Sequence, residues 1–405
     1  MTPLIAPAYG RGSLGDVLPA VLSSLGVARV DTVDSVDRVV GVDGAERLAG
    51  PITLSAVDRV CLLLVDGLGH ELLASAEPSD APFLHSLLSN GRILDAGFPT
   101  STPISLCSLG TGRPPGEHGI VGFTMHVPPV PHVLECLAWT EYGTRADLSA
   151  ALPPETLQPC ETLVAIAARQ GVATTVVSLG DHVGSGLTRA AFRGATFDSV
   201  PSFDDLDRRL ALVAAGLRRS DRALVYTYDA RLDTAAHVDG LGSRAWRAAL
   251  RTTDRVASEI ARVLPPGSVL LVTGDHGGLN VPPKERIDLG VRPDLAADVA
   301  WLSGDPRTRH LHVARGKVEA VARRWKDGLG EEWAVLARDE AIGAGLFGPI
   351  VRPEVRARIG DVVAIATGNG AVFDRSRFPW ELRLAGFHGA LSAAERNVPL
   401  LEYIV

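Results

Sequence analysis

The chain has 405 residues, of which 46% are hydrophobic and 21% charged, and its net charge at pH 7 is −7. This length and composition predict a globular protein with one large domain or two ordinary ones. The acidic balance argues against a nucleic-acid polymer or a membrane as the main partner, and no apolar run approaches the roughly 20 residues that span a bilayer.

The N-terminal residues 1–20 lack a basic start followed by a continuous apolar core, so we expect no signal peptide. The cysteines have no CxxC spacing, and three of the four lie in apolar surroundings. We therefore expect free thiols in a reducing, cytoplasmic compartment and no metal site built from cysteine. The four are Cys61, Cys107, Cys136 and Cys160.

Four short apolar runs predict buried parallel strands, and Ala/Arg/Leu-rich stretches between them predict helices. The helical spacing is clearest at 243–264, where apolar residues recur at intervals of three and four or their sums. Alternating strands and helices predict an α/β/α sandwich around a mostly parallel central sheet. The strands are expected at 59–67, 173–181, 223–231 and 268–277.

After residue 285 the pattern changes to strand, helix, strand, helix, at 307–313, 316–330 and 332–347. This order predicts a small inserted α+β lobe. We expect the chain to rejoin the central sheet at 359–373, and Pro/Gly-rich loops at 126–131 and 153–159 to flank an irregular segment over the site. The expected boundaries are 1–285 for the first part of the α/β core, 286–350 for the lobe and 351–405 for the last part of the core.

Three of the predicted strands end in acidic residues, namely Asp66, the 229–233 segment and Asp275. In doubly wound sheets, ligands bind beyond the carboxyl ends of the strands. These residues can therefore converge on one site, although an Asp-Gly pair such as Asp66-Gly67 is also a common turn.

The stretch "DTAAH" places Asp233 and His237 four residues apart. On a helix or tight turn this spacing puts both side chains on one face, where they can chelate one ion. A surface pair or a helix cap is the alternative. Asp229 and Asp239 lie nearby, but neither has this relation to the histidine.

Adjacent Asp275 and His276 in "VTGDHGG" can chelate one ion only if the backbone bends sharply, and the flanking glycines permit that bend. His388 lies between glycines in "GFHGA", and it becomes a candidate ligand because the other acidic and histidine candidates accompany it. The remaining histidines that we considered are not expected to be ligands. His70 is expected on a helix, His118 in a loop that it shapes, and His310 and His312 on an exposed strand of the lobe.

In "FPTSTP", residues 98–103, Thr102 precedes a proline at the start of a predicted helix. Thr102 is expected to be the N-cap, with Pro103 at the first helical position. A hydroxyl there also lies where the helix dipole and free amides favour phosphate. Because a threonine hydroxyl attacks only with a metal or base beside it, the aspartates and histidines could activate Thr102 through a metal.

Taken in order, these residues resemble the alkaline phosphatase superfamily, and within it the type I phosphodiesterase/nucleotide pyrophosphatase branch, from about residue 58 to the end. The resemblance implies two divalent metal ions, which together can activate a nucleophile and stabilise the leaving oxygen. Zinc is the expected metal, with manganese and iron left open. The implied ligands are Asp233, His237 and His388 for one ion, and Asp66, Asp275, His276 and the Thr102 oxygen for the other.

The resemblance further implies hydrolysis of small phosphate esters, diesters preferred, through a phosphothreonine intermediate at Thr102. Two residues depart from the family pattern. Phe123 stands where nucleotide-hydrolysing members carry an asparagine that grips a phosphate oxygen, so position 123 is expected to face substrate. Pro103 has no backbone amide to offer. Both changes remove hydrogen-bond donors that nucleotide pyrophosphatase activity would use, and both leave the metal ligands unchanged.

Other functions remain open at this point. The same metals could serve a phosphomonoesterase, phosphonate hydrolase, sulfatase or phosphate-transfer mutase, or a metal-binding module without catalysis. Monoester specialists usually add a cation, for which Arg113 and Arg231 are candidates, while the absence of a CxPxR motif argues against a formylglycine sulfatase. Loops within 124–160 and the inserted lobe are expected to determine the substrate.

Overall fold

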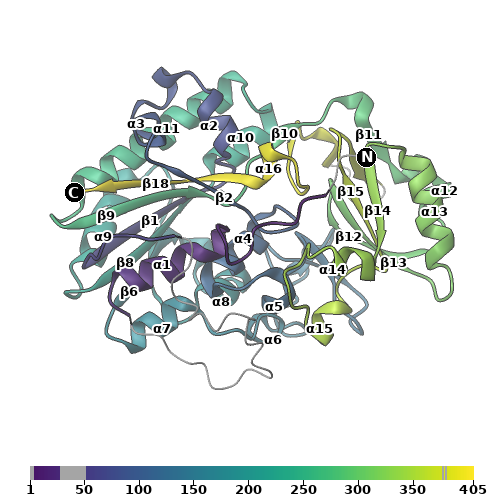
Figure 1. Ribbon diagram of the computed structural model, residues 1–405, viewed down its shortest axis with the longest axis horizontal. Coiled ribbons are helices and arrows are strands. Elements are labelled where there is room, and N and C mark those ends of the chain that lie inside the picture. The colour runs from purple at the N-terminus through teal and green to yellow at the C-terminus, as the bar shows by residue number, and fades with distance from the viewer. Residues whose placement is uncertain (1–3, 28–51, 376–377, 379–380) are drawn as a thin grey trace.

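Two seven-stranded sheets lie side by side in the molecule (Figure 1). The structure is a computed structural model that describes residues 4–27, 52–375, 378 and 381–405. Among these residues no helix combines the length and the apolar composition needed to cross a bilayer. The four cysteines are free, as predicted, and all but Cys160 are buried.

The first sheet has the strand order β2-β18-β9-β1-β8-β6-β7. Strands β9, β1, β8, β6 and β7 run parallel, whereas β18 is antiparallel to both of its neighbours. The four predicted strands and the mostly parallel central sheet are thus confirmed. The bounds are β1 Arg59–Val65, β2 Arg92–Asp95, β6 Ala173–Leu179, β7 Thr196–Val200, β8 Ala223–Asp229, β9 Ser268–Gly274 and β18 Asn397–Ile404.

Helices cover both faces of this sheet, which explains why its strands are continuous apolar runs. In β1, Leu62 packs into the core on one face and Leu63 into the core on the other, because side chains alternate along a strand. In Figure 1, α2, α3, α10 and α11 lie above the sheet and α1, α4, α7 and α8 below it. The bounds are α1 Val17–Ser24, α2 His70–Ser75, α3 Pro82–Leu88, α4 Thr102–Thr111, α7 Leu163–Arg169, α8 Gly186–Phe192, α9 Leu206–Leu217, α10 Arg231–Asp239 and α11 Arg244–Val263.

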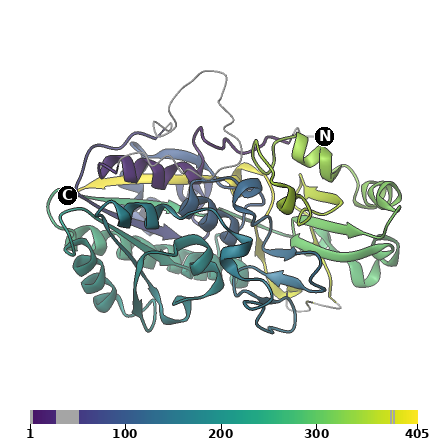
Figure 2. The same ribbon diagram turned by 90° about the horizontal axis from the view of Figure 1, so that it is seen from below.

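The second sheet has the order β14-β15-β13-β12-β3-β4-β5, and its strand pairs are antiparallel. Figure 2 shows it from below, beside the first sheet. The strand–helix–strand–helix order predicted after residue 306 is confirmed in β13, α13, β14 and α14. The bounds are β3 Thr124–His126, β4 Val133–Glu135, β5 Thr140–Glu141, β12 Val299–Asp305, β13 Thr308–Val313, β14 Trp333–Ala337, β15 Val362–Ala366, α13 Val318–Leu329 and α14 Arg338–Gly343.

Three expectations for this region are wrong. β15 pairs with β13 and β14, so residues 359–373 do not rejoin the first sheet. The segment expected to be irregular, between the loops at 126–131 and 153–159, contributes β4 and β5, which join the second sheet although they lie outside 286–350. His310 and His312 are buried rather than exposed on their strand. An apolar run shows that a strand is buried but not which sheet buries it, because the pairing partner is distant in the chain.

Several short elements complete the fold. Two strand pairs, β10 with β17 and β11 with β16, form small separate sheets. These elements are α5 Pro115–His118, α6 Pro154–Leu157, α12 Pro293–Ala296, α15 Pro353–Arg356, α16 Ala393–Arg396, β10 Leu279–Asn280, β11 Arg286–Asp288, β16 Ala371–Phe373 and β17 Gly386–Phe387.

Candidate active site

The carboxyl ends of three adjacent strands carry the predicted acidic residues. β1 lies between β8 and β9, with Val65 opposite Asp229 on one side and Gly274 on the other. Asp66 and Asp275 therefore follow neighbouring strand ends, and Asp233 stands on α10, directly after β8. The convergence expected from the sequence is present in the structure.

Gly67 makes this convergence sterically possible. Its φ of +74° is readily adopted by glycine, and a Cβ atom there would lie 3.0 Å from the Cβ atom of Asp233. The N–H group of Gly67 donates to Oδ1 of Asp275 at 3.0 Å. The turn after β1 thus contacts the aspartates that follow both neighbouring strands.

The three predicted histidine ligands share one arrangement. Each ring places Nδ1 on a backbone carbonyl: His237 on Gly386 at 2.8 Å, His276 on Gly277 at 2.9 Å and His388 on Thr100 at 2.7 Å. Because a carbonyl only accepts, Nδ1 carries a proton, and Nε2 is the nitrogen that can bind a metal ion when the ring is neutral. A backbone acceptor on the second nitrogen is typical of histidines that bind metal.

Two sets of three side chains could each hold a metal ion, because the ligand atoms within each set all lie within 4.8 Å of one another. Asp66, Asp275 and His276 form the first, which is buried and equals one of the two sets implied by the family resemblance. The second, which is more exposed, contains Asp233 and His388 as implied, but with His276 in place of His237. His237 instead lies beside Asp233, its Nε2 3.2 Å from Oδ2. The side chain of Asp229 belongs to neither set, because it pairs with Arg209 and Arg231.

The donor set fits a divalent metal ion. Oδ2 of Asp275 is buried, accepts no hydrogen bond from any residue that the structure describes and lies 3.6 Å from Nε2 of His276. An unsatisfied buried carboxylate oxygen is costly unless a cation or a proton meets it. Carboxylate and imidazole ligands suit zinc, and the residues that would hold the ions are those of the two sets and His237.

The pKa values of the carboxyl groups and histidines in the site are shifted by burial and by neighbouring charges. Burial, followed by the charges of Asp275 and Asp233, raises the pKa of Asp66 well above its ordinary range, and burial raises that of Asp275 to about 6. Burial also lowers the pKa of His388 to about 3. His237 differs, because the adjacent Asp233 outweighs burial and raises its pKa to about 9. A bound cation would favour charged carboxylates and neutral imidazoles, the forms that ligate.

Thr102 faces the buried set. Its Oγ1 lies 3.2 Å from Nε2 of His276 and 3.5 Å from each carboxylate oxygen of Asp66. The expectation that Thr102 is the N-cap is wrong: Ser101 holds that position with extended backbone, and Thr102 is the first residue of α4. Neither hydroxyl caps the helix, so the Thr102 oxygen is free for the aspartates and the histidine.

Tyr228 is a site residue that the sequence does not reveal. Its O–H donates to Oδ2 of Asp66, and its ring lies 5.8 Å from that of His182 and 6.1 Å from that of Phe203. In the run "ALVYTYD" it looks like any aromatic residue of a buried strand. Only the position of β8 next to β1 identifies its role.

Two other candidate residues, Phe123 and Arg113, belong to neither ligand set. The N–H group of Phe123 donates to Asp305 at 3.2 Å, while its ring packs against that of Tyr142, 6.1 Å between centroids. Arg113 follows the C-terminal end of α4 and pairs with Glu117 at 3.0 Å. A ten-residue helix is about 15 Å long, so Arg113 is remote from Thr102.

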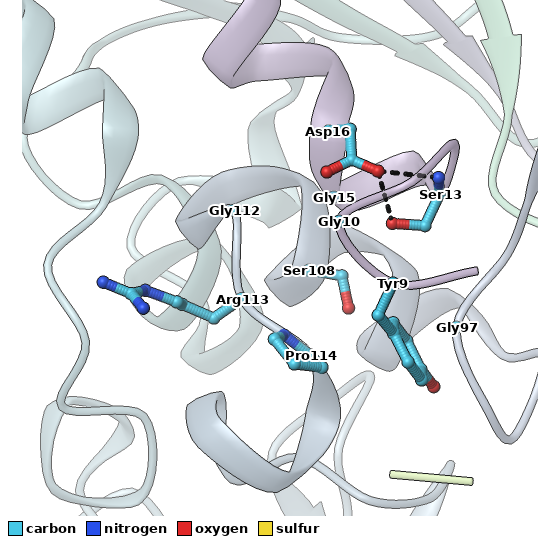
Figure 3. A pocket seen from close by; sticks show the side chains of 10 residues that line it. All are labelled: Tyr9, Gly10, Ser13, Gly15, Asp16, Gly97, Ser108, Gly112, Arg113 and Pro114. Carbon is cyan, nitrogen blue, oxygen red and sulfur yellow. Dashed lines mark hydrogen bonds between the residues drawn. The ribbon is translucent and has the colours of Figure 1, made fainter. Parts of the chain in front are cut away.

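Two cavities lie near these elements. One of about 20 Å³, between Tyr9, Asp16, Ser108 and Arg113, holds about one water and is too small for a substrate (Figure 3). The other, of about 360 Å³, opens between Phe203 and a face of α10 that carries Arg231, Thr234 and Val238. The lining residues of this second cavity include none of the candidate ligands, and they lie on another face of α10 than Asp233 and His237.

Residues 60–391 match the family model "Type I phosphodiesterase / nucleotide pyrophosphatase". The chain therefore belongs to this family, within the alkaline phosphatase superfamily, and it is a hydrolase. No curated protein matches it in sequence.

Among solved structures, murine ectonucleotide pyrophosphatase/phosphodiesterase 5 is similar in fold, with a TM-score of 0.64 and 18% identity over 84% of this chain and 87% of that one. Its inactive threonine-to-alanine variant in complex with AMP scores 0.64 at 17% identity, over 85% and 87%. The human protein scores 0.65 at 17% identity, over 85% and 87%.

Proposed function

We propose that this protein is a two-zinc phosphodiester hydrolase that works through a phosphothreonine intermediate at Thr102. The observation that carries the proposal is the position of the Thr102 hydroxyl, 3.2 Å from His276 and 3.5 Å from Asp66, inside a buried ligand set. When bound, the two ions would neutralise the phosphoryl oxygens and lower the pKa of the hydroxyl.

The side chains of the site divide the work. Asp66, whose two carboxylate oxygens each lie 3.5 Å from Oγ1 of Thr102, accepts the proton that the attacking hydroxyl loses, and Tyr228 keeps Asp66 in place through its hydrogen bond. The Thr102 oxygen forms a bond to phosphorus as the bond to the leaving oxygen breaks, and water then cleaves the phosphothreonine ester. The partly exposed set with Asp233 and His388 marks the side from which substrate and water approach.

A diester is favoured over a monoester by the charges of the described residues. Arg113 lies at the far end of α4, and Arg231 is engaged by Asp229 and by the carbonyl of Phe203. Neither is placed to meet the additional charge of a monoester. The AMP complex of the murine relative supports a nucleotide-sized substrate.

Replacement of Thr102 by Ala tests the proposal. We expect the rate on a chromogenic phosphodiester to fall about 10⁴-fold, as for loss of other nucleophiles, with metal content retained. Thr111→Ala, in the last turn of the same helix, controls for stability, since that hydroxyl bonds only within the helix and to Arg113. Equal activity of T102A and the wild type would remove Thr102 as nucleophile. The same chromophore as a monoester measures the preference for diesters.

A further inference from the structure

The tip of the β12–β13 hairpin reaches from the second sheet to the first-sheet site. Arg307 lies at this tip, and its guanidinium meets Glu395, which precedes β18. Nε lies 2.6 Å from Oε1 and Nη2 lies 3.0 Å from Oε2, which makes a bidentate pair. Both side chains have 0% exposure. The two sheets are thus joined by an ion pair without access to water.

Glu395 connects this ion pair to both histidine loops. Its Oε1 accepts the N–H group of Ala390 at 2.9 Å, two residues after His388. Its backbone carbonyl accepts the N–H group of Gly277 at 2.9 Å, directly after His276. One residue therefore fixes the backbone that follows two of the candidate ligands.

The neighbouring residue of the hairpin contacts the same loop. Oγ1 of Thr308 donates to the carbonyl of Gly389 at 2.6 Å. The N–H group of Gly389 donates to Oγ1 of Thr100 at 2.9 Å, and Nδ1 of His388 donates to the Thr100 carbonyl. The turn at His388 is held between the hairpin of the second sheet and the loop that leads to Thr102.

Arg307 is itself fixed on its other side. Nη1 donates to the carbonyl of Gly370 at 2.7 Å, and Nη2 donates to that of Gly368 at 3.0 Å. Burial alone would raise the pKa of Glu395, but Arg307 and the other donors lower it, so the carboxylate stays charged. A buried ion pair adds little stability compared with apolar side chains of similar size, so stability alone does not explain the pair of Arg307 and Glu395.

We propose that Arg307 is a positioning residue for the metal centre. Through Glu395, it holds the loops of His276 and His388 so that their rings stack, with centroids 3.6 Å apart and planes at 18°. This arrangement places both Nε2 atoms in one ligand set with Asp233. The inference rests on the proposed metal-dependent function. The second sheet thus helps to determine the geometry of the metal centre.

Arg309 provides a matched control, two residues further along β13. It is 1% exposed, pairs with Glu381 at 3.2 Å and donates to the Val372 carbonyl at 2.9 Å. Neither of these two contacts involves the loops of His276 and His388. Arg307→Met and Arg309→Met each remove one buried ion pair, so both should lower the melting temperature of the metal-free chain by similar amounts.

The measurement is the Zn²⁺ dissociation constant of metal-depleted protein, determined by competition with a chromophoric chelator. We expect Arg307→Met to weaken binding about 10–100-fold, the usual cost of removing support behind metal ligands, and Arg309→Met to change it less than about threefold. Equal dissociation constants for the two variants would overturn the proposal.

Glu395→Gln and Arg307→Lys keep the test decisive if Arg307→Met does not fold. Glu395→Gln retains an acceptor for Ala390 but loses the charge, and lysine supplies a charge without the two-pronged geometry. Each should weaken Zn²⁺ binding, and wild-type affinity in both would contradict the positioning role. Wild-type protein that binds no Zn²⁺ would instead overturn the proposed function, and the inference with it.

Discussion

The histidines at the edge of the first sheet and those inside the second sheet differ in their hydrogen-bond partners and in the side chains around them. His237, His276 and His388 donate Nδ1–H to backbone carbonyls, and Nε2 of His237 and of His276 lies 3.2 and 3.6 Å from aspartate oxygens. In the second sheet, His310 accepts from the N–H group of Gly360 through Nδ1, and its Nε2 is buried without a partner. The protonated nitrogen of His310 is therefore Nε2, opposite to that of the three site histidines.

Aromatic packing replaces the carboxylates in the second sheet. The ring of His126 stacks on Trp301 at 4.9 Å and meets the edge of His312 at 4.9 Å. Burial lowers the pKa of His310 to about 3 and that of His312 to about 2. Among the described residues, none of these three rings forms an ion pair with a carboxylate. A group of histidines thus indicates a metal site only where acidic strand ends and backbone acceptors accompany it.

The largest difference between the regions should appear on exchange of histidine for asparagine. His276→Asn removes the nitrogen shared by both ligand sets, so we expect kcat/KM on a phosphodiester to fall about 10³-fold or more and metal content to drop. His312→Asn should keep activity within about threefold and lower the free energy of unfolding by about 1–3 kcal/mol. Metal analysis and steady-state kinetics on both variants check this. Comparable losses of activity in the two variants would show that the two groups of histidines do not differ in function.

Acid should destabilise the protein through the second sheet. Unfolded histidines take up protons near pH 6.5, whereas His310 and His312 stay neutral in the folded chain down to about 3 and 2. The unfolded state therefore binds more protons below pH 6.5, and stability is lost as the pH falls. Each such histidine contributes a slope of about 1.4 kcal/mol per pH unit.

Urea unfolding of the wild type and His312→Gln at pH 7.5, 6.0 and 5.0 measures this slope. The variant should be less stable than the wild type at pH 7.5, and the gap should narrow as the pH falls. A constant gap would show that His312 takes no part in the acid sensitivity.

Local patterns account for the parts of the fold and site that the sequence predicts. The strand ending at Asp66 is a buried apolar run, and the spacing of Asp233 and His237 places them on one helical face. Features that depend on a distant partner escape such patterns. β15 could have joined either sheet, and His310 and His312 alternate on a strand as exposed residues would.

Thr102 shows the same limit at the level of one residue. Its sequence context is that of a helix cap, and only the arrival of Asp66 and His276 from two other strands gives its hydroxyl different neighbours. The order of the motifs along the chain, rather than any one of them, carried the functional prediction.

The smallest effect that we predict separates two tyrosines on β8. The O–H of Tyr228 donates to Asp66, whereas the hydroxyl of Tyr226 is buried without a hydrogen-bond partner in the described part of the chain. Tyr228→Phe should weaken Zn²⁺ binding about 10-fold, because a carboxylate ligand loses the donor that orients it. Tyr226→Phe should leave the affinity unchanged and stabilise the fold slightly, since it removes an unsatisfied polar atom. Chelator competition and thermal unfolding of both variants distinguish the roles, and equal affinities would show that Tyr228 only fills space.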